Sequence, residues 1–403
     1  MTSLFIYSRS TLLCFIVKNT TRNNIQEQVN LLVKNAENIW IPRWFDLFSN
    51  PHSGFHERLD QSGTPIDLPR RLVSQCRQII VYSLASNDAY TGKLNDAFDF
   101  IKQHYFIPET GGSVFSLNTE NKIHDHTYDL YAHAFVLLAC AQYYKATKNE
   151  EALAYAKTTL NFIKDHFALH IGYAESLDSD LVPLRTIRRQ NPHMHLLEGC
   201  IFMYGVTKDN TYKDVADTLV SLFLNKFFNT EKGVLHEFFD ENLNVHPQEG
   251  HKIEAGHHGE WIWLLTNYKN IFGQQSNAID SSIDDLFAFV VKYGVDFQKG
   301  GVINSHDSET NTVIDSNKRI WTCFEIFRAA SIMYGYAEHK ENAEKIMLLL
   351  LNNIHNDYIN IKTGRWKEIL DKGMKSVTDF LPATTPYHIY PILKEIKKYI
   401  LPI

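Results

Sequence analysis

The chain has few cysteines, and they are not arranged to bind a metal or to form a set of disulfides. Its 403 residues include five: Cys14, Cys76, Cys140, Cys200 and Cys323. They are odd in number, far apart and set in apolar stretches with helical spacing, and no CxxC motif occurs. This pattern predicts reduced thiols in the core of a cytoplasmic protein and no metal centre.

Long apolar runs and runs of one charge are also lacking. The apolar run at residues 11–17 is too short to cross a bilayer, and no signal-peptide cleavage site follows it. The formal net charge is −6 and is spread along the chain, which argues against nucleic acid or an anionic membrane as a partner. We expect residues 1–22 to be a poorly ordered N-terminal extension.

The sequence also lacks a phosphate-binding loop, a nucleotide fingerprint and a nucleophile motif, so we expect no cofactor. Hydrophobic residues make up 44% of the chain and aromatic residues 13%, which is ample for a folded core and excludes general disorder. These features favour a small-molecule substrate. A homodimer is also compatible with these features.

One pattern recurs six times along the chain. A glycine precedes a stretch in which apolar and polar residues alternate, ending at an aspartate or, in the second unit, at Asn118, with a period of about sixty residues. Helical patterns lie on both sides of each stretch, and the alternation predicts a short β-hairpin. The six glycines are Gly54, Gly112, Gly172, Gly233, Gly301 and Gly364.

Six such units give twelve helices, which can close into an all-α (α/α)6 barrel with short β-hairpins at one mouth. We expect a single catalytic domain over residues 23–403. The helices that follow each hairpin form the inner ring, and their N-terminal ends surround the mouth of one cavity.

Two histidine segments stand at the start of predicted inner helices. Residues 190–198 read Gln-Asn-Pro-His-Met-His-Leu-Leu-Glu, in which Asn-Pro is typical of a helix start. His195 and Glu198 are three residues apart and share a helix face, whereas His193 should point elsewhere. His257 and Glu260 repeat this spacing in the second segment, and His388 near the C-terminus is a third helix-start histidine.

Histidines and carboxylates at such positions are suited to acid–base chemistry on an uncharged substrate. Alone, each histidine could instead be a buried structural residue. Core packing is the alternative for Trp321 and Tyr131, and a buried ion pair with Glu325 is the alternative for Arg77. The residues that we expect to converge on the cavity are Arg77, Tyr131, His195, Glu198, His257, Glu260, Trp321, Glu325 and His388.

A ring of histidines, carboxylates, an arginine and aromatic side chains suits a sugar. Aromatic rings stack on the apolar face of a pyranose, while Arg and Glu bind hydroxyl groups. Two histidines on opposite sides of the sugar could exchange a proton beside the carbonyl through an enediol. Return of the proton to C2 would be an epimerisation, and return to C1 an isomerisation.

The two histidine segments, Tyr387-His388, Gln75-Cys76-Arg77 and the segment 318–321 resemble the N-acylglucosamine 2-epimerase superfamily, which includes cellobiose 2-epimerases and mannose isomerases. The resemblance runs from about residue 25 to the C-terminus. It implies the (α/α)6 barrel and metal-independent proton transfer by His257 and His388.

The resemblance also implies roles for other residues. His195 matches a histidine that opens the sugar ring or orients it, and Arg77 matches a substrate-binding arginine. Glu198 and Glu260 match carboxylates that position the sugar or tune the histidines. His193, His258 and Gly259 depart from some branches, which leaves the substrate open. The form of residues 191–198 is nearest the mannose isomerases and acylglucosamine epimerases, which favours a monosaccharide.

Other readings remain. An (α/α)6 glycoside hydrolase would use two of Glu198, Glu260 and Glu325 and leave the histidines idle. A non-catalytic sugar-binding toroid would be expected to lack one of the two bases. A metal site at His257, His258 and Glu260 conflicts with adjacent histidines pointing apart on a helix. Arg185, Arg188 and Arg189 could hold a phosphate, or could form a solvated basic loop.

Overall fold

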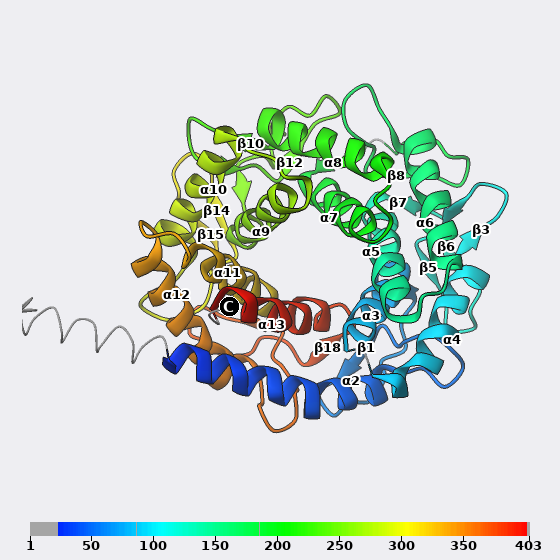
Figure 1. Cartoon of the computed structure of the whole chain (residues 1–403), viewed down its shortest axis with the longest axis horizontal. Coiled ribbons are helices and arrows are strands. Elements are labelled where there is room, and N and C mark those ends of the chain that lie inside the picture. Colours follow the sequence, from blue (N-terminus) through cyan, green and yellow to red (C-terminus); the bar gives the residue numbers. More distant parts are fainter. Residues whose placement is uncertain (1–22, 86, 185, 401–403) are drawn as a thin grey trace, which may run out of the picture.

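The computed structural model describes residues 23–85, 87–184 and 186–400. The expected extension over residues 1–22 lies outside this range. In the described part, six helices surround a central axis and six helical segments surround them, which confirms the predicted (α/α)6 barrel (Figure 1).

The inner ring closes on itself. Each inner helix packs against the next, and the last packs against the first. The inner helices are α3 (Leu72–Ala85), α5 (Leu130–Thr147), α7 (Gln190–Thr207), α9 (Ala255–Phe272), α11 (Ile320–Met333) and α13 (Pro386–Ile400).

The outer helices alternate with the inner ones, and a five-residue π-helical turn ends most of them. The first outer segment consists of a helix over 23–35, η1 (Ala36–Trp40) and α2 (Ile41–Phe48). The others are α4 (Asp88–His104), α6 (Glu151–Phe162) with η2 (Ile163–Phe167), α8 (Asn210–Leu222) with η3 (Phe223–Phe227), α10 (Asn277–Phe289) with η4 (Val290–Gly294), and α12 (Lys340–Asn353) with η5 (Ile354–Tyr358).

The two rings differ in how their helices are buried. In α4 the buried residues include Tyr90, Leu94, Phe98 and Ile101, which lie three or four residues apart and form one stripe facing the inner ring. In α5 every residue from Ala132 to Tyr143 is buried, because this helix packs on outer helices on one side and on the barrel interior on the other.

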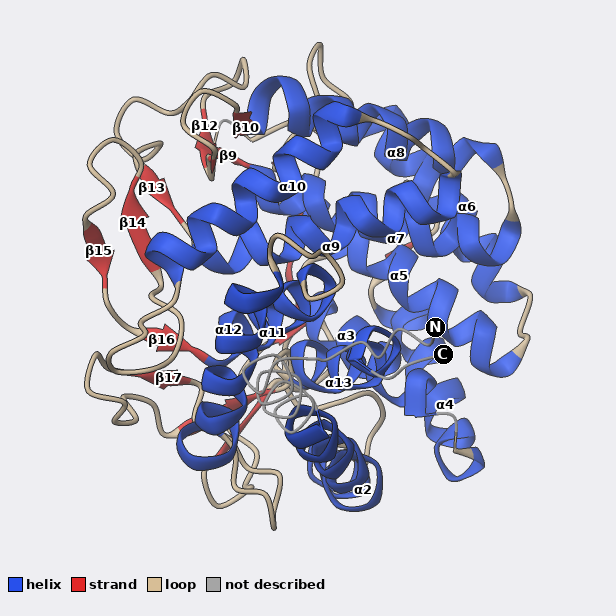
Figure 2. Ribbon diagram, turned by 60° about the vertical axis from the view of Figure 1, so that its left-hand side comes forward, coloured by secondary structure: helices blue, strands red, loops and turns tan. Residues whose placement is uncertain are grey.

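Short strands gather at one end of the barrel (Figure 2). The strand that precedes each inner helix pairs antiparallel with the hairpin of the following unit, and β18 before α13 pairs with β1 of the first unit. The pairs are β2 (Arg70–Arg71) with β5 (Ser116–Leu117), β7 (Tyr128–Asp129) with β8 (Ser176–Leu177), β9 (Arg188–Arg189) with β12 (Phe238–Phe239), β13 (Lys252–Ile253) with β14 (Ser305–Asp307), β16 (Lys318–Arg319) with β17 (Ile369–Leu370), and β18 (Phe380–Pro382) with β1 (Arg58–Asp60).

The predicted hairpins are also present. Two are complete, β5 with β6 (Ile123–Asp125) and β14 with β15 (Val313–Asp315). Four others are held by single bridges, at Leu59–Pro65, Leu177–Pro183, Phe239–Val245 and Leu370–Ser376. Where the outer helices end, β3 (Phe106–Ile107) pairs with β4 (Gly112–Ser113), and β10 (Phe228–Asn229) with β11 (Val234–Leu235).

The turn before each hairpin explains the recurring glycine. Gly364 has a φ of +69°, and a Cβ atom there would lie 2.7 Å from the ring of Trp40. Only glycine meets both requirements without strain. In the second unit the glycine with positive φ is Gly111 rather than Gly112.

Cys76, Cys140, Cys200 and Cys323 are buried as separate thiols, as the sequence predicts, and burial raises their pKa. Cys14 lies outside the described residues. Among the helices of the described chain, none has both the length and the apolar character needed to cross a membrane.

Candidate active site

The inner helices place one residue each at the same level of the barrel. The sixth residue of α3, α5, α7, α9 and α11 is respectively Arg77, Phe135, His195, Glu260 and Glu325. Because all these helices start at the strand end of the barrel, their sixth residues face one another around the axis. His388 of α13 completes the set, since its Nδ1 contacts Glu325.

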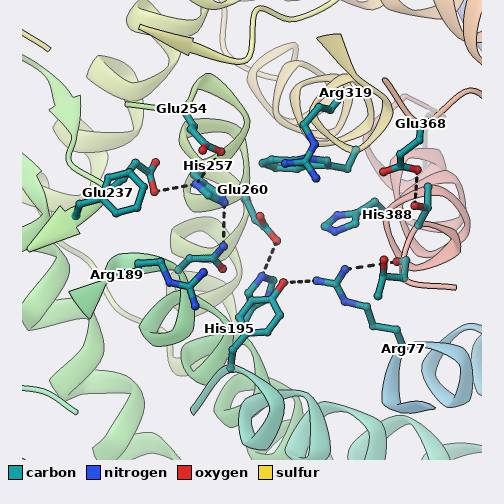
Figure 3. Close-up of a pocket in the computed structure, with 16 residues that line it drawn as sticks. Arg77, Arg189, His195, Glu237, Glu254, His257, Glu260, Arg319, Glu368 and His388 are labelled. Atoms are coloured by element: carbon teal, nitrogen blue, oxygen red, sulfur yellow. Dashed lines mark hydrogen bonds and ion pairs between the residues drawn. The ribbon is translucent and has the colours of Figure 1, made fainter. Parts of the chain in front are cut away.

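A cavity of about 250 Å³ opens above this level (Figure 3). Every predicted site residue lines it except Glu198 and Glu325, which are buried behind His195 and His388. The lining residues are Arg77, Tyr131, Arg189, Asn191, His195, Glu237, Phe238, Glu254, His257, Glu260, Arg319, Trp321, Glu368, Thr384, Thr385 and His388.

His257 is oriented by a carboxylate that the sequence did not reveal. Its Nδ1 lies 2.9 Å from Oε2 of Glu237, which stands just before β12, and its Nε2 lies 3.2 Å from the Nδ2 of Asn191 (Figure 3). With Nδ1–H donated to Glu237, Nε2 is the ring nitrogen that faces the cavity, and it is a donor when His257 is protonated and an acceptor when it is neutral. Glu260, three residues along the helix, does not fill this role and lies 3.7 Å from the Nε2 of His195.

His388 is held in the same manner. Its Nδ1 lies 2.7 Å from Oε1 of Glu325, and the second oxygen of that carboxylate accepts a hydrogen bond from Arg328. The Arg328 guanidinium in turn lies 3.5 Å from the centre of the Trp263 ring. Glu325 therefore orients His388 and is paired with Arg328, not with Arg77 as the alternative reading proposed.

His195 belongs to a third pair of this kind. Its Nδ1 lies 2.9 Å from Oε2 of Glu198, as the i, i+3 spacing predicts. The Tyr387 hydroxyl donates to the same carboxylate at 2.6 Å. Burial raises the pKa of Glu198 to about 7, so this pair can take up or release a proton near neutral pH.

The two histidines proposed as bases differ in protonation. Burial alone would lower the pKa of His257, but the carboxylates of Glu237, Glu254 and Glu260 together outweigh it, Glu237 most, and raise the pKa to about 9. The pKa of His388 is well below its usual value, because it is buried and near Arg77, His195 and Arg328. At neutral pH one histidine is therefore a cation and the other a neutral base.

Trp321 lies between these two histidines. Its ring centre is 5.1 Å from that of His257 and 5.6 Å from that of His388. Arg77 donates to the Tyr131 hydroxyl and to the carbonyl oxygen of Thr384 (Figure 3). Trp321 and Tyr131 thus line the cavity and are not only core residues.

His193 and His258 point away from the cavity, as predicted. The Nε2 of His193 accepts the backbone N–H of Tyr173, and that of His258 accepts the N–H of Leu235. The alternative metal site at His257, His258 and Glu260 is therefore not formed. His133 makes the same contact with Ser113.

Two other groups bring nitrogen and oxygen atoms within 4.8 Å of one another: His195, Glu198 and Glu260, and Glu260, Glu325 and His388. In each group a hydrogen-bond donor contacts one carboxylate, whereas Oε1 of Glu260, which belongs to both groups, has no hydrogen-bond partner among the described residues. Tyr387 donates to Glu198, and Arg328 donates to Glu325.

Glu237 could have been found from the internal repeat. A glutamate stands immediately before the hairpin strand in four units, as Glu57, Glu175, Glu237 and Glu368. Asn191, Glu254, Arg319, Thr384 and Thr385 also line the cavity without having been predicted to do so.

The basic segment before α7 does not form a phosphate site as a unit. Arg188 is buried and donates to the carbonyl oxygens of Ile171, Tyr173 and Glu241. Arg189 lines the cavity but is paired with Glu175. Arg185 lies outside the described residues.

Several proteins are similar to this chain in sequence or in structure. A mannose-6-phosphate isomerase of Rhizobium meliloti is 26% identical over 374 residues, covering 89% of this chain and 93% of that protein. The structure of a cellobiose 2-epimerase from Bacillus thermoamylovorans superposes with a TM-score of 0.84 at 21% identity, covering 92% and 99% of the two chains. A D-mannose isomerase structure gives 0.80 at 24% identity, covering 89% and 96%.

These relatives confirm the predicted class of activity, a carbohydrate epimerase or isomerase, and give no better support to a glycoside hydrolase. Residues 54–391 match the family described as N-acylglucosamine 2-epimerase. The match spans most of the barrel and includes all three carboxylate-held histidines. The chain belongs to the N-acylglucosamine 2-epimerase family.

Proposed function

We propose that the protein interconverts a mannose- or N-acylglucosamine-type monosaccharide with its C2 epimer or its ketose. One observation carries the proposal: His257 and His388 stand on either side of Trp321 in one cavity, and each has its Nδ1 held by a carboxylate. The relatives named for mannose 6-phosphate and D-mannose support a mannose-type substrate.

The size of the cavity favours one sugar ring. Its volume of about 250 Å³ is at the small end of ligand pockets. The indole face of Trp321 offers a surface on which a pyranose or open-chain sugar can lie. Arg77 and Tyr131 are placed to bind the carbonyl oxygen, and His195 with Glu260 to open the ring.

In the proposed reaction His388, the neutral histidine, removes the proton from C2. The electron pair moves to the carbonyl group and forms an enediolate, whose oxygen is stabilised by Arg77 and by the imidazolium of His257. A proton from His257 to the opposite face of C2 gives the epimer. Protonation at C1 gives the ketose.

The carboxylates of the site do not suit hydrolysis. Glu325 is bonded to Arg328 and His388, and Glu198 to Tyr387 and His195. Neither lines the cavity, so neither can reach both sides of a glycosidic bond. A binding toroid, in turn, would not need two histidines each fixed for proton transfer.

The test is proton NMR of the purified protein with D-mannose, D-glucose, N-acetyl-D-mannosamine and cellobiose, each in D2O. Fructose formed from mannose establishes an isomerase. A C2 epimer carrying deuterium at C2, without ketose, establishes an epimerase. Turnover of cellobiose but of no monosaccharide would contradict the proposed substrate class.

We also propose that residues 23–403 act as one catalytic domain. A cytoplasmic location and a homodimer stay predictions. Size-exclusion chromatography with light scattering tests the dimer.

A further inference from the structure

Three arginines line the cavity, and their surroundings differ. Arg77 is bonded to Tyr131 and Thr384, and Arg189 to Glu175. Arg319 is half-buried, with its guanidinium 5.7 Å from the centre of the Trp321 ring. Within the described residues, no carboxylate forms an ion pair with Arg319, and its buried Nε has no hydrogen-bond partner.

The corresponding arginines in two other repeat units each have a carboxylate partner, which Arg319 lacks. Arg71, Arg189 and Arg319 are each the second residue of the strand that precedes an inner helix. In the first unit the backbone N–H and the Nε of Arg71 donate to Glu57, at 2.9 and 2.7 Å. In the third unit Arg189 makes the same two contacts with Glu175, at 3.0 and 2.6 Å.

The fifth unit has the arginine but not the carboxylate. Glu57 and Glu175 each stand immediately before a hairpin strand, and the residue in that place before β14 is Asn304. Its Nδ2 donates to Asp315 at 2.9 Å. An amide cannot neutralise a guanidinium, so the charge of Arg319 remains directed at the cavity.

We propose that Arg319 binds an anionic group on the substrate, a phosphate ester on the carbon farthest from the reacting C1 and C2. The inference rests on the proposed function and specifies its substrate class. A guanidinium presents two parallel N–H groups that match two oxygens of a phosphate, and Arg319 is the residue before the N-terminus of α11, whose partial positive charge also favours an anion.

Two carboxylates also stand near this position. Glu368 accepts hydrogen bonds from Trp366 and Thr385, and burial raises its pKa. Burial likewise raises the pKa of Glu254. Neither is within ion-pair distance of Arg319 in the described structure, so both leave its N–H groups open to a ligand while limiting how strongly an anion is held.

Two variants test the proposal. R319Q removes the charge, and N304E supplies the carboxylate that the first and third units contain, which neutralises Arg319 without removing it. Wild-type and variant proteins are assayed with D-mannose, D-mannose 6-phosphate and D-mannuronate. Binding of 1,5-anhydro-D-mannitol and its 6-phosphate, which have no carbonyl group and cannot react, is measured by calorimetry.

We expect the wild-type protein to prefer the phosphorylated sugar. In both variants kcat/KM and the affinity for the phosphorylated forms should fall about 10- to 100-fold, because a charge-assisted contact is lost. Turnover of D-mannose, which has no anionic group for Arg319 to bind, should fall less than turnover of the phosphate, so the preference for the phosphate over D-mannose should fall in both variants. Preference for mannuronate over the phosphate would identify a carboxylate as the anion and overturn the phosphate assignment.

Equal wild-type binding of the anhydromannitol and its phosphate overturns the inference, and turnover of D-mannose in the same protein leaves the proposed function intact. Arginine-dependent binding of the phosphate without turnover of any sugar supports the inference and overturns the proposed function.

Discussion

Two sets of histidines stand on the inner helices, with one member of each set on α7 and on α9, and they differ in their hydrogen-bond partners and in what they face. His133, His193 and His258 each accept a backbone N–H of the segment between the outer helix and the hairpin, and donate from Nδ1 to a backbone carbonyl. His195, His257 and His388 each contact a carboxylate with Nδ1 and direct Nε2 to the cavity.

The difference follows from position on the helix. His133, His193 and His258 are the fourth residues of α5, α7 and α9, which face the outer ring and the turns. In α3 the fourth residue is Gln75, whose amide makes both contacts with the backbone of Phe55. A histidine in this place is therefore a hydrogen-bonding side chain that glutamine can replace, whereas the cavity histidines need an imidazole.

The largest expected effect is on turnover when a cavity histidine is replaced. H257N and H388N should each lower kcat by about 10²–10⁴-fold, because each removes a proton donor or acceptor from the reaction. Both variants should still fold and unfold cooperatively, although each loses a contact with a buried carboxylate, Glu237 or Glu325. Steady-state kinetics measure the turnover, and thermal unfolding measures the cooperativity.

The matched control is H258Q, one residue from His257. It should keep most of the wild-type kcat. If H258Q lost as much turnover as H257N, the distinction between the two sets of histidines would be wrong.

The next effect is on stability. H258A leaves the buried N–H of Leu235 without an acceptor and opens a cavity, which should lower the free energy of unfolding by about 2–4 kcal/mol. H258Q should recover most of this loss, as Gln75 does in the first unit. Urea unfolding followed by circular dichroism measures both. Equal loss in the two variants would show that the hydrogen bond does not matter there.

The third effect concerns Glu237. In E237Q the carboxylate that contributes most to raising the pKa of His257 to about 9 is gone, so the pKa should fall toward 6.5. The alkaline limb of kcat/KM should move down with it, from near 9 in the wild type, and turnover at pH 8 should fall about 30-fold. An unmoved limb would mean that a group other than His257 limits activity at high pH.

The smallest effect is the pH dependence of stability. Burial is the main cause that lowers the pKa of His133 and His258 to about 4, so the folded protein keeps them neutral while the unfolded chain binds a proton below 6.5. Stability should therefore fall as the pH drops from 6.5 toward 4. His257 acts oppositely, since its raised pKa gives stability that is present below 6.5 and is lost as the pH rises through about 9.

Replacing His133 by glutamine should reduce the loss of stability between pH 7 and pH 5 by about 1–2 kcal/mol. Urea unfolding at the two pH values measures this. The same acid loss in H133Q and the wild type would assign it to carboxylates alone.

The repeat made most of the fold predictable. A glycine that needs a positive φ recurs with the same helical patterns around it. Because there are six such units, a closed ring of twelve helices could be predicted. The pairing of each hairpin with the strand of the preceding unit was not predictable, because two-residue strands carry no pattern of their own. It depends on where the ring places them.

The site was predictable where a helix spacing sets the contact, as for His195 with Glu198. The site was not predictable where the contacting residue comes from another helix or loop. Glu237 reaches His257 from a loop, and Glu260 at i+3 contacts His195 across the cavity instead. Arg319 lacks an ion-pair partner because residue 304 is not a glutamate, and this difference is seen only when the units are compared with one another.

Solvent deuterium exchange at C2 tests the central claim most directly. The wild type and H258Q, incubated with the accepted aldose in D2O, should incorporate deuterium at C2, and H257N and H388N should fail to do so at a comparable rate. Exchange that continued in H388N at the wild-type rate would show that His388 does not remove the C2 proton, and would contradict the account.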